Sequence, residues 1–421
     1  MPNSLPVRED LPSVLGARRA TPDHPFEIEV ALLTGGFDKP YALGLAMALV
    51  SNEVRLDYVG SGDVDSPQLH TTSKVCFFNL LGDPRERANL PRKVTRILTS
   101  YSKLIRYASV ARPLVFHILW NNRLQWFDRT LLTLYYKLLG KKIAYTAHNV
   151  NAGRRDGNDS VVNRLTLRIQ YRLVDHIFVH TETMKTELLE DFGVAKKKVT
   201  VIPFGINDSV PSTELTPAQA KQRLGIANRQ RTILFFGNIG PYKGIEILVE
   251  AFHQISAKNA NYHLIIAGKP RGGCEQYVAE IQEAINSYDM RERVATRIEF
   301  IPDEETELYF KAADLLVLPY KEVYQSGVLF LGYNFGLPVV ATNVGSLRED
   351  IITGETGFVC RPCDPVDLAE TIERYFKSDL FKALDSRRRQ IKDFAKERYS
   401  WNHIGRVTRD IYAQLQGKES L

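Results

Sequence analysis

Short apolar runs that alternate with amphipathic stretches constrain the fold of this chain more than any other feature. Most of the runs are nearly continuous in apolar residues, as in Ile28–Leu33 and Leu315–Leu318. Continuous apolar runs are typical of parallel strands that helices cover on both faces, whereas a strand with one solvent-exposed face alternates apolar and polar residues. Since strand–helix repetition implies right-handed crossovers, the pattern predicts doubly wound α/β sheets with parallel strands.

Two such series follow one another. In the first half the expected strands are Ile28–Leu33, Arg55–Val59, Lys74–Phe78, Leu114–Leu119, Lys142–Thr146, His176–Val179 and Lys198–Ile202. In the second half they are Thr232–Phe236, His263–Ala267, Arg297–Ile301, Leu315–Leu318, Pro338–Thr342 and Gly357–Cys360. Amphipathic patterns between the strands predict helices, among them 92–111, 123–139, 304–313 and 380–398.

The alternation lapses over residues 206–230, which are polar and include two prolines. We therefore expect a flexible tail over 1–24, an N-terminal Rossmann-like domain over 25–205, an interdomain linker over 206–230, a second Rossmann-like domain over 231–398 and a C-terminal segment over 399–421. Ligands of open parallel sheets bind beyond the carboxyl ends of the strands. Two such domains facing each other across a cleft would bring these loops into one site.

The composition fits a soluble globular protein. Hydrophobic residues make up 44% of the chain and charged residues 25%, and the apolar runs are far shorter than the roughly 18 residues that span a bilayer. The N-terminus has no apolar core, so no secretory signal is indicated and we expect a cytoplasmic protein. Cys360-x-x-Cys363 has no second pair or nearby histidines and indicates neither a zinc site nor a redox site.

Positive charge is concentrated in the first half. The whole chain has 55 Lys and Arg against 49 Asp and Glu, a net +6, whereas residues 85–142 contain 13 Lys and Arg against Glu86 and Asp128 only. A basic surface favours an anionic partner such as a membrane, nucleic acid or phosphorylated substrate, and a solvated helical surface is the plainer alternative. No aromatic–basic recognition motif accompanies it, which argues against nucleic acid.

Glycine-containing loops follow the first expected strand of each half. Gly35-Gly36 lets backbone approach a ligand beside a helix N-terminus that favours anions. Gly237-Asn238 leads to Lys243-Gly244, and a lysine at a helix start suits a diphosphate. Neither loop matches a dinucleotide fingerprint or a P-loop, and an ordinary strand-to-helix turn is the alternative for both.

Other polar residues follow expected strands. In Gln325-Ser326-Gly327-Val328, Ser326 can cap the next helix while the Ser326–Val328 amides bind phosphate oxygens; an ordinary N-cap is the alternative. His148 and, more weakly, His180 could position or protonate a substrate, or merely satisfy a loop hydrogen bond. Asp63 and Asp65 form an acidic pair of a kind that can chelate a divalent metal, but such pairs arise often by chance in Gly/Ser-containing loops, and we expect no metal site.

No single loop points to a protein family, but the motifs taken together in their order do. The set comprises Val199–Asn207, Phe236–Asn238 with Lys243-Gly244, Leu264–Gly268, Phe300–Asp303, Ala313–Pro319, Gly336–Thr342, Val344–Glu349 and Gly354-x-x-Gly357. Together they resemble the retaining glycosyltransferases of the GT-B fold, specifically family 4. The likeness is densest over 198–363 and looser in the first half, which would host the acceptor.

The resemblance implies roles for individual residues. Lys243, Gly35-Gly36 and the Ser326–Val328 amides would bind the donor diphosphate, and His148 would face the donor sugar. The expected catalytic residues are His148 and Glu322, and the expected donor-binding residues are Gly35, Gly36, Gly237, Asn238, Lys243, Gln325, Ser326, Gly327, Val328 and Glu349. The segment from Tyr399 and the helix after it resemble the part of the family that crosses back to the first domain.

Three departures from the family pattern stand out. An arginine that often follows the glycine of the Lys243 loop is Asn238 here. The family's two glutamates, with seven residues between them, fall on Val323 and Leu331 in an ungapped register, and Glu322 lies one residue before the first. The Gln-Ser-Gly form of this loop looks like a subgroup of the family, so the departures put the donor nucleotide in doubt rather than activity itself.

The resemblance implies a transferase that moves a sugar from a nucleotide diphosphate donor to a glycan or lipid-linked acceptor, with retention of configuration and without a metal or other cofactor. A non-catalytic GT-B subunit that binds a nucleotide sugar and a nucleotide-sugar epimerase are the alternatives. The basic residues Arg92, Lys93, Arg96, Lys103 and Arg106 share an expected helix, which predicts peripheral binding to an anionic membrane, such as the inner face of the cytoplasmic membrane.

Overall fold

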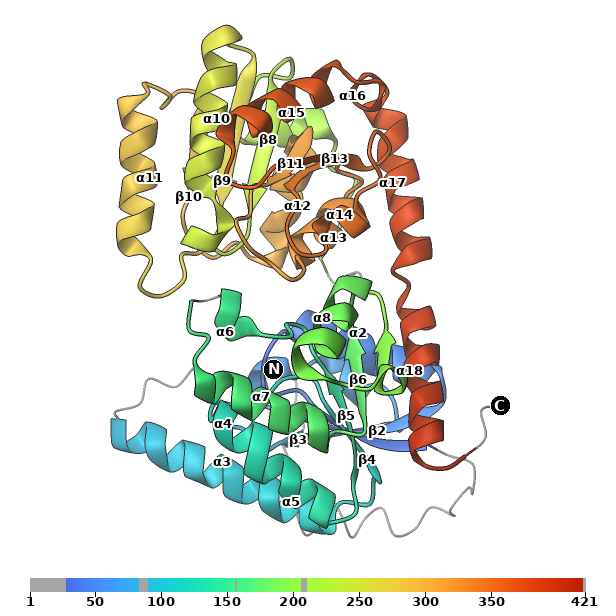
Figure 1. Ribbon diagram of the computed structural model, residues 1–421. Coiled ribbons are helices and arrows are strands. Elements are labelled where there is room, and N and C mark those ends of the chain that lie inside the picture. Colours follow the sequence, from blue (N-terminus) through green and yellow to red (C-terminus); the bar gives the residue numbers. More distant parts are fainter. Residues whose placement is uncertain (1–27, 83–89, 156, 206–209, 419–421) are drawn as a thin grey trace, which may run out of the picture.

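The structure is a computed structural model that describes residues 28–82, 90–155, 157–205 and 210–418. Two α/β domains lie one above the other, each built on a parallel sheet (Figure 1). The expected tail over 1–24 and the start of the expected linker, residues 206–209, lie outside the described residues.

The first sheet has seven parallel strands in the order β3-β2-β1-β4-β5-β6-β7. They are β1 (Ile28–Leu33), β2 (Val54–Gly60), β3 (Val75–Asn79), β4 (Val115–Ile118), β5 (Lys142–Thr146), β6 (His176–Val179) and β7 (Val199–Val201). The second sheet has six, in the order β10-β9-β8-β11-β12-β13. They are β8 (Arg231–Phe236), β9 (Tyr262–Ala267), β10 (Val294–Arg297), β11 (Leu315–Leu318), β12 (Val339–Thr342) and β13 (Gly357–Cys360). Both sheets reverse their strand order beside the first strand of the domain, which confirms the doubly wound class.

One strand prediction was wrong. The expected strand Arg297–Ile301 is replaced by β10, which pairs with β9 from Val294 to Arg297. Because β9 ends at Ala267, the partner of Arg297, the chain beyond Arg297 has no strand to pair with. Ile301 is buried in the core of the second domain instead, while Phe300 is exposed. The apolar residue Ile301 is therefore buried, but the segment around it does not pair as a strand.

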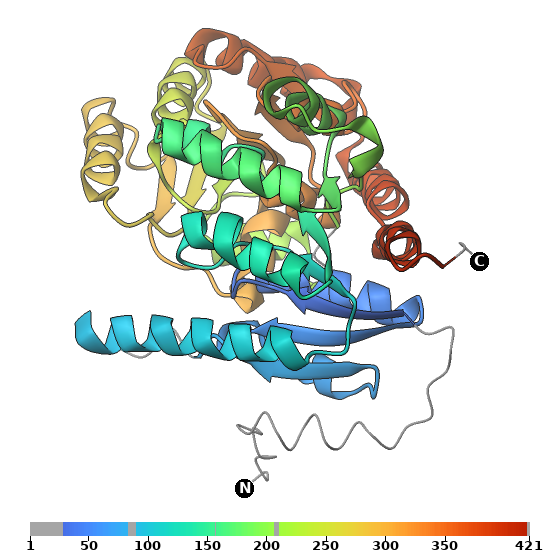
Figure 2. The same ribbon diagram turned by 60° about the horizontal axis from the view of Figure 1, so that its bottom comes forward.

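Helices cover both faces of each sheet. In the first domain they are α2 (Lys39–Ser51), α3 (Leu90–Val110), α4 (Gln125–Phe127), α5 (Thr133–Leu138), α6 (Ala152–Arg155), α7 (Val161–Leu173) and α8 (Glu182–Phe192). The second domain has α10 (Ile245–Lys258), α11 (Glu275–Ser287), α12 (Asp303–Ala312), α13 (Gly327–Asn334), α14 (Leu347–Asp350), α15 (Pro365–Lys377), α16 (Asp379–Lys382) and α17 (Leu384–Arg398). Figure 2 shows α3 reaching along the side of the first sheet.

Two helices expected to be continuous are interrupted. The segment 380–398 is divided between α16 and α17 at Ala383, whose backbone is not helical, and Leu380 and Leu384 on either side of it are both buried. The segment 123–139 contains a π-helical turn, Asp128–Leu132, between α4 and α5. This turn buries Asp128 and Arg129.

Much of the expected linker packs on the second domain. Val210 and Ile226 belong to the core of that domain. Between them lies α9 (Pro217–Arg223), which begins with a capping box formed by Thr216 and Gln219. Lys221 pairs with Asp314 at 2.7 Å, and both side chains are largely buried. The connection to the first domain is therefore short.

The chain returns to the first domain at its C-terminal end. The helices α17 and α18 (Trp401–Leu415) run along one side of both domains (Figure 1). The α18 helix packs on α2, and the Tyr412 hydroxyl lies 2.5 Å from Nδ1 of buried His117. The Trp401 ring fills the space that Cβ atoms at Gly44 and Gly205 would need. Within the described part of the chain, every helix is too short or too polar to cross a bilayer.

Candidate active site

The glycine loop of the first domain lies against Trp120. Gly35 and Gly36 have φ values of +63° and +77°, which glycine adopts without strain. A Cβ at Gly35 would lie 2.7 Å from the Trp120 carbonyl oxygen, and one at Gly36 would lie 3.0 Å from Oγ of Ser61. Side chains at these positions would therefore fill the space at the end of β1.

His148 stacks on the same tryptophan. The two rings are 4.1 Å apart and nearly parallel. Nδ1 of His148 lies 3.0 Å from Nε2 of His180, and Nδ1 of His180 lies 3.2 Å from the Ile202 carbonyl oxygen. Burial lowers the pKa of His180 to about 4 and holds that of His148 well below its usual value, so both rings are neutral at pH 7.

These contacts fix the tautomers of both histidines. The Ile202 carbonyl can only accept, so Nδ1 of His180 carries the proton and its Nε2 accepts the proton of His148 Nδ1. His148 is left with a lone pair on Nε2, which is buried and has no hydrogen-bond partner among the described residues. The histidine is therefore suited to accept a hydrogen bond from a ligand hydroxyl and poorly suited to donate a proton.

In the second domain, Lys243 and Ser326 both contact Tyr320. Nζ of Lys243 lies 3.7 Å from the centre of the Tyr320 ring, and the Tyr320 hydroxyl lies 3.1 Å from Oγ of Ser326. Only 7% of Lys243 is exposed. Lys243 closes a 3₁₀ turn, Pro241–Lys243, which Gly244 joins to α10. The resemblance paired the two residues, but Tyr320 was not foreseen.

The loops on either side of this cluster pack closely. A Cβ at Gly244 would lie 2.1 Å from the Pro319 carbonyl oxygen, and one at Gly237 would lie 3.1 Å from Cγ2 of Val328. Gly327 and Asn238 are exposed at the surface. Oε1 of Gln325 is buried without a hydrogen-bond partner among the described residues.

The predicted capping role of Ser326 was wrong. Ser326 occupies the N-cap position of α13, but its side chain accepts no hydrogen bond from the helix because the hydroxyl contacts Tyr320. The amides at the start of α13 are therefore not capped by Ser326. The departures at Val323 and Leu331 also have a packing explanation, since Val323 is buried and Leu331 packs on the same core.

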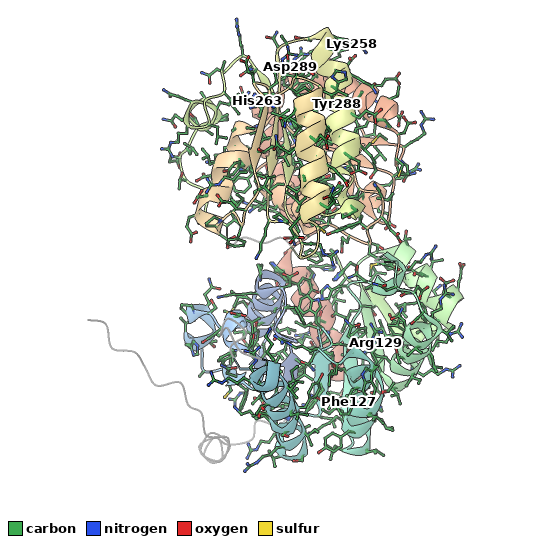
Figure 3. The ribbon with its side chains drawn as sticks, turned by 90° about the vertical axis from the view of Figure 1, so that its left-hand side faces the viewer. Phe127, Arg129, Lys258, His263, Tyr288 and Asp289 are labelled. Atoms are coloured by element: carbon green, nitrogen blue, oxygen red, sulfur yellow. The ribbon has the colours of Figure 1, made fainter. Side chains whose placement is uncertain are left out.

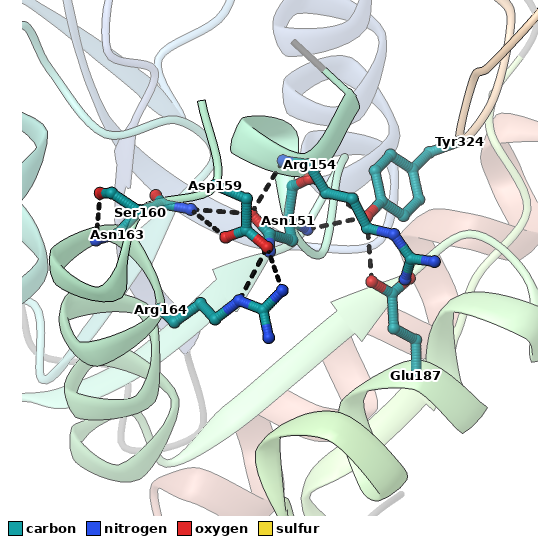
Figure 4. Close-up of polar contacts among 8 residues, drawn as sticks. All are labelled: Asn151, Arg154, Asp159, Ser160, Asn163, Arg164, Glu187 and Tyr324. Atoms are coloured by element: carbon teal, nitrogen blue, oxygen red, sulfur yellow. Dashed lines mark hydrogen bonds and ion pairs between the residues drawn. The ribbon is translucent and has the colours of Figure 1, made fainter. Parts of the chain in front are cut away.

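Polar contacts join the two domains beside this site (Figure 4). The Tyr324 hydroxyl accepts a hydrogen bond from the Asn151 amide at 3.1 Å and donates to Oε1 of Glu187 at 3.0 Å. Burial raises the pKa of Glu187, and among the smaller contributions half-buried Glu322 also raises it. Glu349 is exposed and accepts a hydrogen bond from Thr183 of α8. Glu322 and Glu349 thus lie where the domains meet.

A cavity of about 250 Å³ opens in the first domain beside the glycine loop. Its lining includes Gly35, Gly36, Ser61, Asp63 and Arg96. Asp65, the other member of the acidic pair, is turned toward His70, with Oδ1 2.8 Å from Nε2. Of the five basic residues predicted to share a membrane-facing helix surface, Arg96 lines this cavity and Lys103 is half-buried, while Arg92, Lys93 and Arg106 are exposed.

The arrangement offers two complementary sets of groups. The second domain presents an ammonium group, a hydroxyl and helix-start amides, which suit an anion such as a diphosphate. The first domain presents a hydrogen-bond acceptor on His148 and a cavity beside the glycine loop. The site also contains three aromatic residues that the sequence analysis did not identify as site residues: Trp120, Tyr320 and Tyr324. Their positions just past β4 and β11 were the signal that sequence reasoning could have used.

Family models match both domains. The model described as Glycosyltransferase Family 4 matches residues 40–210, and the model described as Glycosyl transferases group 1 matches residues 218–398. The two matched regions together cover most of the chain.

Two curated proteins illustrate the relatives of the chain. Mannosylfructose-phosphate synthase of Agrobacterium fabrum is 26% identical over 255 residues, which are 59% of this chain and 54% of that protein. D-inositol 3-phosphate glycosyltransferase of Corynebacterium diphtheriae is 23% identical over 362 residues, which are 80% of this chain and 81% of that protein. The chain thus spans about half the length of the first relative and most of the second.

Solved structures show the same two-domain fold. Sucrose-phosphate synthase from Thermosynechococcus elongatus superposes with a TM-score of 0.73 at 19% identity and covers 93% of this chain and 99% of its own. Anabaena HepE in complex with UDP and glucose superposes with a TM-score of 0.70 at 17% identity and covers 91% and 99%. At these identities the likeness shows the fold, which is GT-B.

Proposed function

This chain belongs to family 4 of the glycosyltransferases, and we propose that it moves a glycosyl unit from a nucleotide diphosphate sugar to a glycan or lipid-linked acceptor, with retention of configuration. The observation that carries this proposal is the cluster of Lys243, Tyr320 and Ser326. It gathers a cation, a hydroxyl and backbone amides at the ends of parallel strands, where a departing diphosphate would develop negative charge.

The family resemblance implies a reaction in which each of these groups has a role. The bond between the anomeric carbon and the diphosphate oxygen breaks while Lys243 and the Ser326–Val328 amides stabilise the departing charge. His148 accepts a hydrogen bond from a hydroxyl of the donor sugar through Nε2 and thereby orients the ring. The acceptor hydroxyl forms the new bond on the face that the diphosphate leaves, and its proton passes to a diphosphate oxygen.

A panel of nucleoside diphosphates and nucleotide sugars tests donor binding. A ligand present at 100 times its Kd stabilises the folded state by about 2.7 kcal/mol, so a true donor should raise the melting temperature with the logarithm of its concentration. Nucleosides without the diphosphate should have little effect. If no nucleoside diphosphate shifts the transition at millimolar concentration, the proposal is wrong.

A non-catalytic subunit that binds a nucleotide sugar is the second candidate. The exposed amide of Asn238 and the apolar residues Val323 and Leu331 favour it, since they stand where much of the family has charged side chains. Such a subunit would bind the donor in the same panel but would neither hydrolyse nor transfer it.

We expect activity to persist in excess chelator, because the proposed cation at the diphosphate is Lys243 rather than a metal. In the part of the chain that the structure describes, no three His, Cys, Asp or Glu side chains gather as a metal site. Initial rates should be equal with and without EDTA. Complete loss with EDTA, restored by Mn²⁺ or Mg²⁺, would show that a metal stabilises the leaving group.

We also propose that one surface of the first domain binds anionic membrane. This surface, the apolar–basic face, lies on α3, α4, the π turn, α5 and α7 of the first domain, and the labels Phe127 and Arg129 in Figure 3 mark α4 and the π turn. It comprises the exposed residues Arg92, Lys93, Val94, Leu98, Ile105, Arg106, Trp126, Leu131, Leu134, Leu138, Val161, Val162 and Leu165. Tyr135 on α5 donates to the Ile105 carbonyl of α3, and α7 packs against both α5 and the π turn, so these helices are neighbours.

Charge reversal of Arg92, Lys93 and Arg106 should abolish co-sedimentation with anionic vesicles at low salt. Each basic residue near such a surface contributes about 1 kcal/mol, and apolar side chains add to this by entering the interface. The wild type should sediment with anionic vesicles and less so at high salt. Reversal of three exposed arginines of the second domain, Arg223, Arg229 and Arg291, serves as the control. If the wild type fails to bind, or both variants lose binding equally, the apolar–basic face is not the membrane surface.

A further inference from the structure

We propose that the cavity beside the glycine loop binds a phosphate ester, so that the acceptor of this transferase carries a phosphate. This proposal deepens the proposed function and rests on it in one respect: the bound phosphate ester is an acceptor only if the protein is a transferase. Its basis is the chemistry of the cavity wall, which combines Arg96, Arg123 and an unpaired buried hydroxyl with apolar side chains.

Ser61 is the first reason to expect a ligand. The residue is 3% exposed, and its Oγ is buried without a hydrogen-bond partner among the described residues. A buried hydroxyl without a partner is costly, and native proteins rarely retain one unless a ligand or water completes it. Because a Cβ at Gly36 would lie 3.0 Å from this oxygen, Ser61 stands where the cavity meets the glycine loop. We therefore expect a ligand in the cavity to place a hydroxyl or phosphate oxygen beside Ser61 and the glycine loop.

The charges of the cavity favour an anion. Arg96 reaches the wall from α3 and Arg123 from the loop after β4, and Asp63 is the one carboxylate among the described residues of the lining. Within the described lining, two guanidinium groups stand against one carboxylate, an excess of one formal positive charge. Guanidinium forks match the oxygens of a phosphate ester in bidentate geometry, and they remain charged at every physiological pH.

The rest of the wall is rigid and largely apolar. Leu81, Ile97, Leu104 and Phe37 provide apolar surface for a sugar ring, a polyol or the start of a lipid chain. Tyr101 donates to Oδ2 of Asp128 at 3.1 Å, and Asn122 donates to Oδ1 of the same carboxylate at 3.2 Å. Since Asp128 is buried and holds both residues, the back of the cavity is preformed.

Binding of small phosphate esters to the full chain tests the proposal. The probes are glucose 6-phosphate and glycerol 3-phosphate as free esters, dihexanoylphosphatidylglycerol as a lipid source, and glucose and glucuronate as controls, measured by titration calorimetry at constant ionic strength. At least one phosphate ester should bind at least about tenfold more tightly than glucose and glucuronate. The preferred probe identifies the source, free or lipid-linked. Equal affinity for glucose, or a preference for glucuronate, would overturn the phosphate assignment.

Variants place the binding in this cavity. Arg96→Gln and Arg123→Gln should each weaken the preferred phosphate ester roughly ten- to a hundredfold, whereas Arg112→Gln, an exposed arginine of the same basic stretch, should not. Ser61→Ala should weaken binding without lowering the melting temperature, because no hydrogen bond to a described residue is lost. Lys243→Ala should retain phosphate-ester binding, since Lys243 belongs to the donor site. If Lys243→Ala loses that binding while both arginine variants keep it, the probe occupies the donor site and the cavity assignment is wrong.

Discussion

Replacing Gly345 with alanine should destabilise the second domain by about 3 kcal/mol or more and abolish donor binding. Gly345 has a φ of +53°, and a Cβ there would lie 1.8 Å from the Val323 carbonyl oxygen. A left-handed backbone costs an alanine roughly 1–2 kcal/mol, and overpacking against an atom that cannot move adds roughly 1–3 kcal/mol. Denaturant unfolding measures the change.

The donor effect follows from what this turn holds. The amide and the hydroxyl of Ser346 both donate to the Tyr324 carbonyl, at 3.1 and 2.7 Å, and so fix the chain that continues to Ser326. Gly354→Ala is the matched control, because Gly354 has a φ of +82° but open space around its Cβ position. Gly354→Ala should destabilise the domain only by the backbone strain, roughly 1–2 kcal/mol. Equal destabilisation by both substitutions would show that the contact with Val323 does not constrain the loop.

Replacing Lys243 with alanine should reduce kcat/KM for the donor roughly ten- to a hundredfold in a folded protein. One charge-assisted hydrogen bond to phosphate is worth about 1.5–3 kcal/mol, which corresponds to that range. Lys321→Ala is the control, because Lys321 lies one residue after Tyr320 and pairs with Glu246 at the surface. Unchanged kinetics in a folded Lys243→Ala variant would remove Lys243 from the donor site.

The fold could be predicted because buried parallel strands leave a strong local signal. Leu315–Leu318, His176–Val179 and Lys142–Thr146 have the predicted bounds. The signal reports burial, however, and Phe300-Ile301 shows its limit: Ile301 is buried but has no neighbouring strand. Likewise, the division of 380–398 at Ala383 left no signal in the helical periodicity, because Leu380 and Leu384 are four residues apart and would share one face of a continuous helix as well.

The candidate site could be predicted only in part. The family resemblance assigned Lys243 and Ser326 to one diphosphate site, and both residues follow strands of the second half. The resemblance did not indicate Tyr320, which contacts both, or Trp120, which stacks on His148 from a different strand end. The protonation of His148 was also beyond sequence reasoning, because it depends on a chain of contacts through His180 to the Ile202 carbonyl.

The most direct test of the account is a transfer assay with the donor that the binding panel selects. The wild type should release nucleoside diphosphate and form a glycosylated product, with proton NMR showing the anomeric configuration of the donor in that product. The Lys243→Ala variant should form the same product roughly ten- to a hundredfold more slowly. Binding of the donor by the wild type without hydrolysis or transfer to any phosphorylated or neutral acceptor would contradict the account and favour a non-catalytic subunit.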